Sequence, residues 1–229
     1  MGGGDGGLLV VLEGAEGAGK TTHLRRLETH LRTAGRDVVA LREPGGTPLG
    51  TAIRELLLDT ASEIAPAAEA LLFMASRAQI VVREIRPALA SGRIVLLDRF
   101  FLSTYAYQIG GRGLAEDDVQ SANALATGGL VPDLTLVLDV DPEEGLSRAR
   151  ERGAQDRMER SGREFHDRVA AAFRTYLTDA WQMRHPECGP IVRVEAGGGA
   201  DEDTVFRRVL EPLARRWPET FPSSKGSQS

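Results

Sequence analysis

Near the start of the chain, residues 14–21 have the types and spacing that bind phosphate, Gly-x-x-x-x-Gly-Lys-Thr. Gly14 and Gly19 let the backbone bend without a Cβ in the way, so successive N–H groups can point at one anion. Lys20 adds a full positive charge, and Thr21 offers a hydroxyl to Mg²⁺. The alternative is a glycine-rich turn that matches by chance. We expect a nucleotide-phosphate loop of nine residues: Gly14, Ala15, Glu16, Gly17, Ala18, Gly19, Lys20, Thr21 and Thr22.

A second pair of chemically useful residues, Asp98 and Arg99, directly follows the apolar run at 93–97. An aspartate at the end of such a strand can hold the Mg²⁺ shell beside a phosphate-binding loop. Arg99 can bridge phosphate oxygens with its forked guanidinium. The alternative is a strand-end salt bridge without a ligand, and the neighbouring phosphate loop favours the first interpretation.

Arginines are dense over 148–163. A run of charge is usually a solvated face. The competing interpretation is a mobile lid that brings guanidinium groups over a transferred phosphate, whose charge must be neutralised away from water. We favour the lid, because the loop at 14–21 makes a phosphate available. The arginines in question are Arg148, Arg150, Arg152, Arg157, Arg160 and Arg163.

The interpretation of two further groups of side chains depends on their surroundings. Phe73 and Arg77 are four residues apart on a predicted helix, so they share a face and could hold a planar heterocycle by stacking and hydrogen bonding. On spacing alone, a core Phe beside a solvated Arg is the better interpretation. Residues 103–108 carry hydroxyl and amide groups on one face of another predicted helix, a weak pattern that many helices share.

Strand and helix patterns alternate along the chain and predict the elements that position these residues. Strands are expected at 8–12, 37–41, 93–97, 134–138 and 191–194, and helices at 51–58, 65–90, 165–183 and 203–215. Asp141 and the Pro-Glu-Glu after it predict another helix start. This alternation is typical of an α/β fold with a five-stranded parallel sheet wrapped by helices, in which ligands bind at the carboxyl ends of the strands. We expect one domain over 8–216, with the lid at about 148–163 and disordered ends at 1–7 and 217–229.

Composition limits the function classes. The chain has 229 residues and a formal net charge of -5, so it carries no overall footprint for nucleic acid or an anionic membrane. Its single cysteine, Cys188, cannot form an internal disulfide, which fits a reducing compartment. No apolar run approaches the ~20 residues of a membrane span, and the N-terminus lacks a signal-peptide pattern. We therefore expect a cytoplasmic protein.

Three stretches resemble one family. They are Arg-Glu-Pro-Gly-Gly-Thr at 42–47, Asp-Arg-Phe-Phe-Leu-Ser-Thr-Tyr-Ala-Tyr-Gln at 98–108 and Gly-Gly-Arg-Gly at 110–113. Together with the loop at 14–21 they are similar to bacterial thymidylate kinases, over about residues 8–213. The resemblance implies a P-loop kinase three-layer sandwich, Mg²⁺-assisted phosphorylation of dTMP by ATP to give dTDP and ADP, and a homodimer.

The resemblance also implies roles for single residues. Asp98 and Arg99 match the pair around the reacting phosphates, and Lys20 the lysine that contacts them. Glu16 matches a loop acid near the sugar 3′-hydroxyl and magnesium, which would make it a third metal-site residue with Thr21 and Asp98. The remaining substrate contacts that it implies are Arg54 on the acceptor phosphate, Phe73 stacked on thymine, Arg77 on a base carbonyl, Thr104 at a polar contact to the base, and Tyr107 against the 2′ carbon. Gln108 is also expected to bind the substrate.

Position 17 divides the family. Some members carry an arginine inside the loop, whereas others carry basic residues in the lid instead. This chain has Gly17 and a lid rich in arginine, so it resembles the second kind. The candidates for the catalytic lid cation are Arg150, Arg152 and Arg157.

Two rival functions stay open on the sequence. One is a P-loop kinase for another nucleoside monophosphate or a small metabolite. The other is a nucleotide-dependent switch, against which stands the absence of an Asn-Lys-x-Asp motif.

Overall fold

Five parallel strands form one sheet in the order β2-β3-β1-β4-β5 in the computed structural model, which describes residues 6–151, 153 and 156–222. The strands are β1 (Leu8–Glu13), β2 (Val38–Arg42), β3 (Ile94–Asp98), β4 (Leu134–Asp139) and β5 (Ile191–Glu195). Each neighbouring pair is parallel. All five strands and the parallel α/β class predicted from the sequence are therefore confirmed, with ends that differ by one residue at most.

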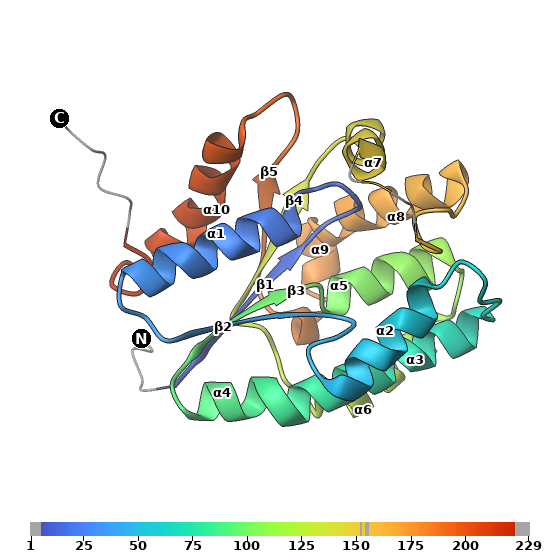
Figure 1. The fold of residues 1–229 in the computed structure, drawn as a ribbon, viewed down its shortest axis with the longest axis horizontal. Helices are drawn as coiled ribbons and strands as arrows, with labels where there is room; N and C mark the ends of the chain where they lie inside the picture. Colours follow the sequence, from blue (N-terminus) through green and yellow to red (C-terminus); the bar gives the residue numbers. More distant parts are fainter. Residues whose placement is uncertain (1–5, 152, 154–155, 223–229) are drawn as a thin grey trace.

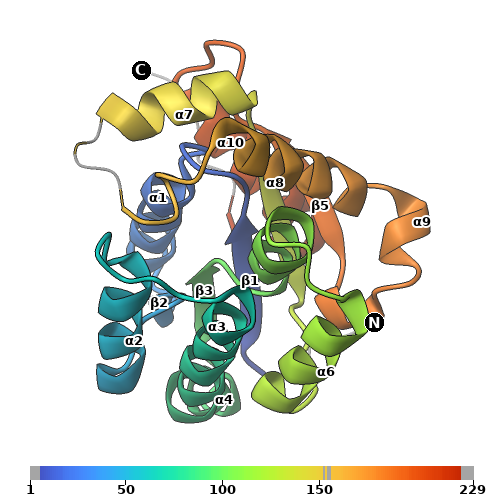
Figure 2. The same cartoon turned by 90° about the vertical axis from the view of Figure 1, so that its right-hand side faces the viewer.

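Helices cover both faces of the sheet (Figures 1 and 2). On one face, α1 (Lys20–Thr33) and α10 (Glu202–Arg216) pack on Val10 and Leu12 of β1. The other face carries Leu9 and Val11, since successive side chains of a strand point to opposite sides. This second face is covered by α3 (Pro66–Ile80), η1 (Val81–Ile85), α4 (Arg86–Ala90), α5 (Phe101–Thr104), η2 (Tyr105–Gly111), α6 (Glu116–Thr127), α8 (Arg163–Tyr176) and α9 (Asp179–Gln182).

Three more elements lie around this frame. The helix α2 (Pro48–Leu58) packs against α3, α7 (Pro142–Glu151) follows β4 above the carboxyl end of the sheet, and the short η3 (Pro186–Cys188) precedes β5. Asp141 accepts hydrogen bonds from the backbone N–H groups of Glu143 and Glu144, as expected of a residue at a helix start. No helix of the described part of the chain is long and apolar enough to cross a membrane.

Two long helices expected from the sequence are interrupted. The expected helix at 65–90 widens into π-helical turns at Val81–Ile85, directly before Pro87. Proline has no N–H to donate to the preceding turn, and π-turns commonly accommodate such a break. The expected helix at 165–183 is two helices, because Thr178 is extended between α8 and α9. The sequence patterns did not predict α6.

The folded chain extends past α10. The side chain of Phe221 is fully buried against the α1–α10 face, and its ring lies 6.0 Å from that of Trp217. Residues 217–222, which were expected in a disordered tail, are therefore part of the described structure. The expected disorder at 1–5 and 223–229 falls outside the described residues.

Candidate functional site

The phosphate-binding loop joins the end of β1 to the start of α1. Gly14, Gly17 and Gly19 all have positive φ, at 143°, 70° and 87°, which glycine adopts without steric cost. The Lys20 ammonium donates to the carbonyl oxygens of Gly14 at 2.9 Å and Ala15 at 2.8 Å. Burial, and next the nearby charge of Arg99, lower the pKa of Lys20 to about 8. The loop therefore holds a desolvated cation that an anionic ligand would stabilise.

Gly17 also brings the loop into contact with α7, the helix that leads into the segment expected to form a lid. A Cβ at Gly17 would lie 1.8 Å from the carbonyl oxygen of Gly145 in α7, and a Cβ at Gly145 would lie 2.4 Å from that of Glu16. Two backbones thus touch where neither has a side chain. The loop has no room for a side chain at position 17 while α7 keeps this place.

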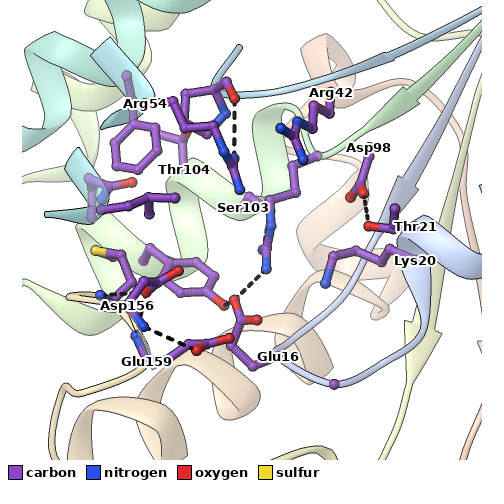
Figure 3. A pocket seen from close by; sticks show the side chains of 18 of the residues that line it. Glu16, Lys20, Thr21, Arg42, Arg54, Asp98, Ser103, Thr104, Asp156 and Glu159 are labelled. Atoms are coloured by element: carbon purple, nitrogen blue, oxygen red, sulfur yellow. Dashed lines mark hydrogen bonds and ion pairs between the residues drawn. The ribbon is translucent and has the colours of Figure 1, made fainter. Parts of the chain in front are cut away.

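Thr21 and Asp98 meet beside Lys20, as Figure 3 shows. The Thr21 hydroxyl donates to Asp98 Oδ2 at 2.5 Å, because the paired strands β1 and β3 place Leu12 opposite Asp98. Mg²⁺ prefers oxygen ligands, and it is usually bound by one or two protein oxygens together with substrate phosphates and water. Among the described residues no group of three acidic, His or Cys side chains could form a complete metal cage. Thr21 and Asp98 fit the Mg²⁺ that a nucleotide brings.

Arg99 lies between the loop and η2. Its backbone has φ 72°, a left-handed conformation uncommon outside glycine, which directs the side chain back over the loop. The guanidinium donates to Glu16 Oε1 at 2.5 Å and to Ser103 Oγ at 3.0 Å, and it lies 5.2 Å from the centre of the Tyr107 ring. Tyr107 also donates to Glu16 Oε1, at 3.0 Å. Glu16 is therefore held by Arg99 and Tyr107.

Glu13 positions this turn, and the sequence patterns did not identify it. Its fully buried carboxylate accepts from the backbone N–H groups of Phe100 at 2.7 Å and Ser103 at 3.0 Å, and from Ser103 Oγ at 2.6 Å. The signal was an acidic residue that ends an apolar strand. Such a residue is costly to bury without several donors.

A cavity joins the phosphate loop to the residues expected around a base. The sequence-predicted residues that line it are Glu16, Gly17, Gly19, Lys20, Thr21, Thr22, Arg54, Phe73, Arg77, Asp98, Arg99, Thr104, Tyr107 and Gln108. Gly14, Ala15 and Ala18 lie within the loop but do not line the cavity. Residues not proposed for the site complete its wall: Arg42, Pro44, Leu58, Ser103, Asp156, Met158 and Glu159.

Two arginines lie at the upper edge of this cavity in Figure 3. Arg54 donates to the carbonyl oxygen of Pro44 at 3.2 Å. Burial, together with the charges of Arg42 and Arg99, lowers the pKa of Arg54. Three guanidinium groups close enough to repel one another create a region that favours an anion.

The three arginines expected as candidates for the catalytic lid cation differ in position. Arg150 is exposed in the last turn of α7 and does not line the cavity, and Arg152 lies outside the described residues. Arg157 turns toward the body of the protein, where it donates to the carbonyl oxygen of Leu57 at 2.8 Å and to the buried Glu69 at 2.6 Å. In this structure Arg157 anchors the segment that lines the cavity and does not lie at the phosphate loop.

Glu69 is the hub of that anchor. It also accepts from Gln108 Nε2 at 3.0 Å and from Arg112, at 3.0 Å and 3.1 Å. These donors, with that of Arg157, lower the pKa of the Glu69 carboxyl, although burial alone would raise it. Gln108 and the segment at 156–159 are thus fixed by one buried carboxylate.

A phosphate-binding loop, an Asp-Arg pair on the adjacent strand and a second pocket on the far side of one cavity define the class of P-loop kinases for small molecules. A family model described as Thymidylate kinase matches residues 12–184. The chain belongs to the thymidylate kinase family.

Similarity to individual relatives agrees with this family membership. The chain is 54% identical to a thymidylate kinase of Deinococcus radiodurans, over 73% of this chain and 81% of the relative. It is 47% identical to one of Pseudomonas fluorescens, over 90% and 97% of the two chains. The crystal structure of thymidylate kinase from Ehrlichia chaffeensis matches with a TM-score of 0.70 and 29% identity, over 91% of this chain and 99% of the other. The P-loop kinase fold implied by the resemblance is confirmed.

Proposed function

We propose that this enzyme transfers the γ-phosphate of ATP to dTMP, giving dTDP and ADP. Its family membership supports the chemistry. The single observation that carries the assignment is that Lys20 and Thr21 line the same cavity as Phe73 and Arg77. A phosphate donor and a planar acceptor could therefore meet in one enclosed space, with Arg99 between them.

The residues support transfer by positioning and charge neutralisation. An ionised phosphate oxygen of the acceptor needs no strong base, so in-line attack depends chiefly on alignment and on nearby cations. Lys20 would exchange its carbonyl partners for phosphate oxygens of ATP, and Arg99 would lie beside the transferred group. When bound through Thr21 and Asp98, Mg²⁺ supplies charge compensation for the phosphates. Glu16, proposed above as a third metal-site residue, is better placed to receive the acceptor sugar, because Arg99 and Tyr107 already hold it.

On the acceptor side, we propose that Phe73 stacks on the base and that Arg77, Thr104 and Gln108 contact its polar edge. Arg54, with Arg42 nearby, would bind the acceptor phosphate, and Tyr107 would exclude a 2′-hydroxyl. Arg150 and Arg152 remain the candidates for the lid cation. Arg157 is the weaker candidate, since Glu69 and Leu57 hold it in place.

We also propose a homodimer. Support comes from five exposed apolar side chains on the neighbouring helices α2, α3, η1 and α6, which lie side by side in Figures 1 and 2. They are Leu49, Leu56, Leu71, Val82 and Leu125, and Leu125 is 87% exposed. Exposed apolar side chains that gather on neighbouring helices commonly mark an interface. We further propose a cytoplasmic location, which the buried free thiol of Cys188 fits.

A panel of acceptors at fixed ATP and Mg²⁺ tests the substrate. We expect dTMP to be phosphorylated with a higher kcat/KM than dUMP, UMP, CMP or AMP. Lys20→Ala should lower turnover on the order of 10²-fold or more, the scale seen when one transition-state donor is removed. Preferred phosphorylation of another monophosphate would favour the rival kinase function, and ATP consumption without a phosphorylated small product would favour a nucleotide-dependent switch.

A further inference from the structure

Arg77 is the most completely enclosed charged side chain of the cavity wall, at 2% exposure. Its Nε donates to Glu43 Oε2 at 2.7 Å, and its Nη2 lies 2.7 Å from the same oxygen. Nη2 also donates to the carbonyl oxygen of Phe100 at 2.8 Å, and Nη1 donates to Asn123 Oδ1 at 2.5 Å. The guanidinium plane lies against the Phe100 ring, 4.9 Å from its centre.

Within the described structure, one N–H bond of the Arg77 guanidinium remains for a ligand. A guanidinium carries five N–H bonds in a fixed fork. Glu43, Phe100 and Asn123 face four of them, and the second N–H of Nη1 has no partner among the described residues. Because Arg77 lines the cavity, the site offers a single charged N–H at this point of its wall.

A gain in folding stability does not explain the buried carboxylate of Glu43. Glu43 is 4% exposed, and in the described part of the chain its other oxygen, Oε1, has no hydrogen-bond partner and Arg77 is its only ion-pair partner. Burial raises the pKa of Glu43, even though Arg77 opposes the shift. A buried ion pair with an unpaired oxygen commonly costs more in desolvation than it returns.

Asn123 reaches Arg77 from α6, a helix that contributes no residue to the cavity lining. It is 1% exposed. The Arg77 guanidinium is thus fixed by the end of β2, by the turn after β3 and by α6. Three separate elements restrict one side chain whose own helix, α3, already holds its Cα in place.

We propose that Glu43 and Asn123 are positioning residues for base recognition, which fix Arg77 so that one Nη1 N–H faces the acceptor base. A base with a carbonyl oxygen at this point accepts that hydrogen bond. A base with an exocyclic amino group there would set N–H against N–H in a desolvated pocket. This inference rests on the proposed function, and it assigns part of the discrimination between thymine and cytosine to residues outside the cavity wall.

The test replaces Asn123 with Leu, which has similar size and no acceptor. We expect the KM for dTMP to rise about tenfold or more, the scale of one hydrogen bond to a charged group. The KM for ATP should stay within about twofold, and the dTMP-to-dCMP ratio of kcat/KM should fall. Asn123→Asp retains an acceptor oxygen and should recover most of the loss.

Thr127→Val is the matched control. Thr127 is one turn further along α6, is 2% exposed and donates only to the backbone oxygen of Asn123. Its replacement perturbs the buried face of the same helix without touching Arg77, so it should leave the dTMP-to-dCMP ratio of kcat/KM unchanged. If it lowered that ratio as Asn123→Leu does, the effect would belong to helix packing and the inference would fail.

A mutant cycle covers the case in which Asn123→Leu does not fold. Glu43→Gln is then measured alone and in the Arg77→Ala background. If Glu43 acts through Arg77, Glu43→Gln should change the KM for dTMP in the wild-type background and not in the Arg77→Ala background. Unchanged KM and selectivity in a folded Glu43→Gln or Asn123→Leu protein would overturn the inference. A wild-type protein that does not prefer dTMP would instead overturn the proposed function.

Discussion

The pKa of Lys20 makes nucleotide binding depend on pH. Without a ligand, burial and Arg99 lower that pKa to about 8. Phosphate oxygens of ATP favour the charged ammonium and must raise the pKa. Binding therefore takes up a proton wherever the free protein has lost one, which is above about pH 8. Affinity for ATP should fall as pH rises through this range.

The size of the expected change in ATP affinity follows from the protonated fraction of Lys20. With a pKa of about 8, the free protein is about 90% protonated at pH 7 and about 10% protonated at pH 9. If ATP binds only the ammonium form, its association constant at pH 9 should be about one-tenth of that at pH 7. Tyr107 and Cys188 do not titrate in this window, since burial raises the pKa of both groups.

Isothermal titration calorimetry at constant ionic strength measures both quantities. The Kd for ATP is determined at pH 7, 8 and 9, and the number of protons taken up comes from paired buffers of different ionisation enthalpy. We expect about half a proton at pH 8 and nearly one at pH 9. Lys20→Arg is the control, because arginine keeps its charge over this range. Whatever its magnitude relative to that of the wild type, the Kd of this variant for ATP should not vary with pH. A pH-independent Kd without proton uptake in the wild type would refute the reasoning.

Three further predictions concern the sugar pocket, the loop–α7 contact and the lid anchor. Tyr107→Ala should raise the use of UMP relative to dTMP, whereas Tyr107→Phe, which keeps the ring, should not; an unchanged ratio in Tyr107→Ala would remove this residue from the sugar pocket. Gly145→Ala should lower the free energy of unfolding by about 1–3 kcal/mol, and with it the melting temperature, because the new Cβ would lie 2.4 Å from the Glu16 carbonyl oxygen. Gly→Ala within a helix is normally favourable, so a higher melting temperature would contradict the contact. Arg157→Ala should raise the KM for dTMP more than it lowers kcat, because it frees the wall at 156–159; loss confined to kcat would instead place Arg157 at the transferred phosphate.

The sequence predicted the sheet well because buried parallel strands are continuous apolar runs, which need no partner to be recognised. The phosphate loop was equally legible, since Gly14, Gly19, Lys20 and Thr21 are adjacent in sequence and in space. Where the expected helix at 65–90 widens before Pro87, the apolar pattern continues without a visible break. Periodicity reports which face is buried, and it does not report how the backbone hydrogen bonds are shifted.

The supporting residues of the site were harder to predict, because their partners are distant in sequence. Glu69 meets Arg157 across 88 residues, and Arg77 meets Asn123 across 46. Local pattern marks 148–163 as rich in arginine, but it cannot tell which guanidinium turns inward. That choice is made by a buried carboxylate on another helix, which is visible only once α3 and the lid segment are placed together.

The contact between Gly17 and Gly145 gives a physical reason why the loop carries no arginine at position 17. Position 17 has φ 70° and its missing Cβ would lie 1.8 Å from a backbone oxygen of α7, so an arginine there would have to displace the helix that leads into the lid. Under the proposed function the cation therefore has to come from another position, and the candidates are Arg150, in the last turn of α7, and Arg152, which follows it in the sequence. Because α7 rests directly on the loop backbone, the start of the proposed lid segment is fixed against the phosphate-binding loop. Close glycine packing thus excludes position 17 for the cation, and it keeps the helix that leads to the proposed replacement next to the loop.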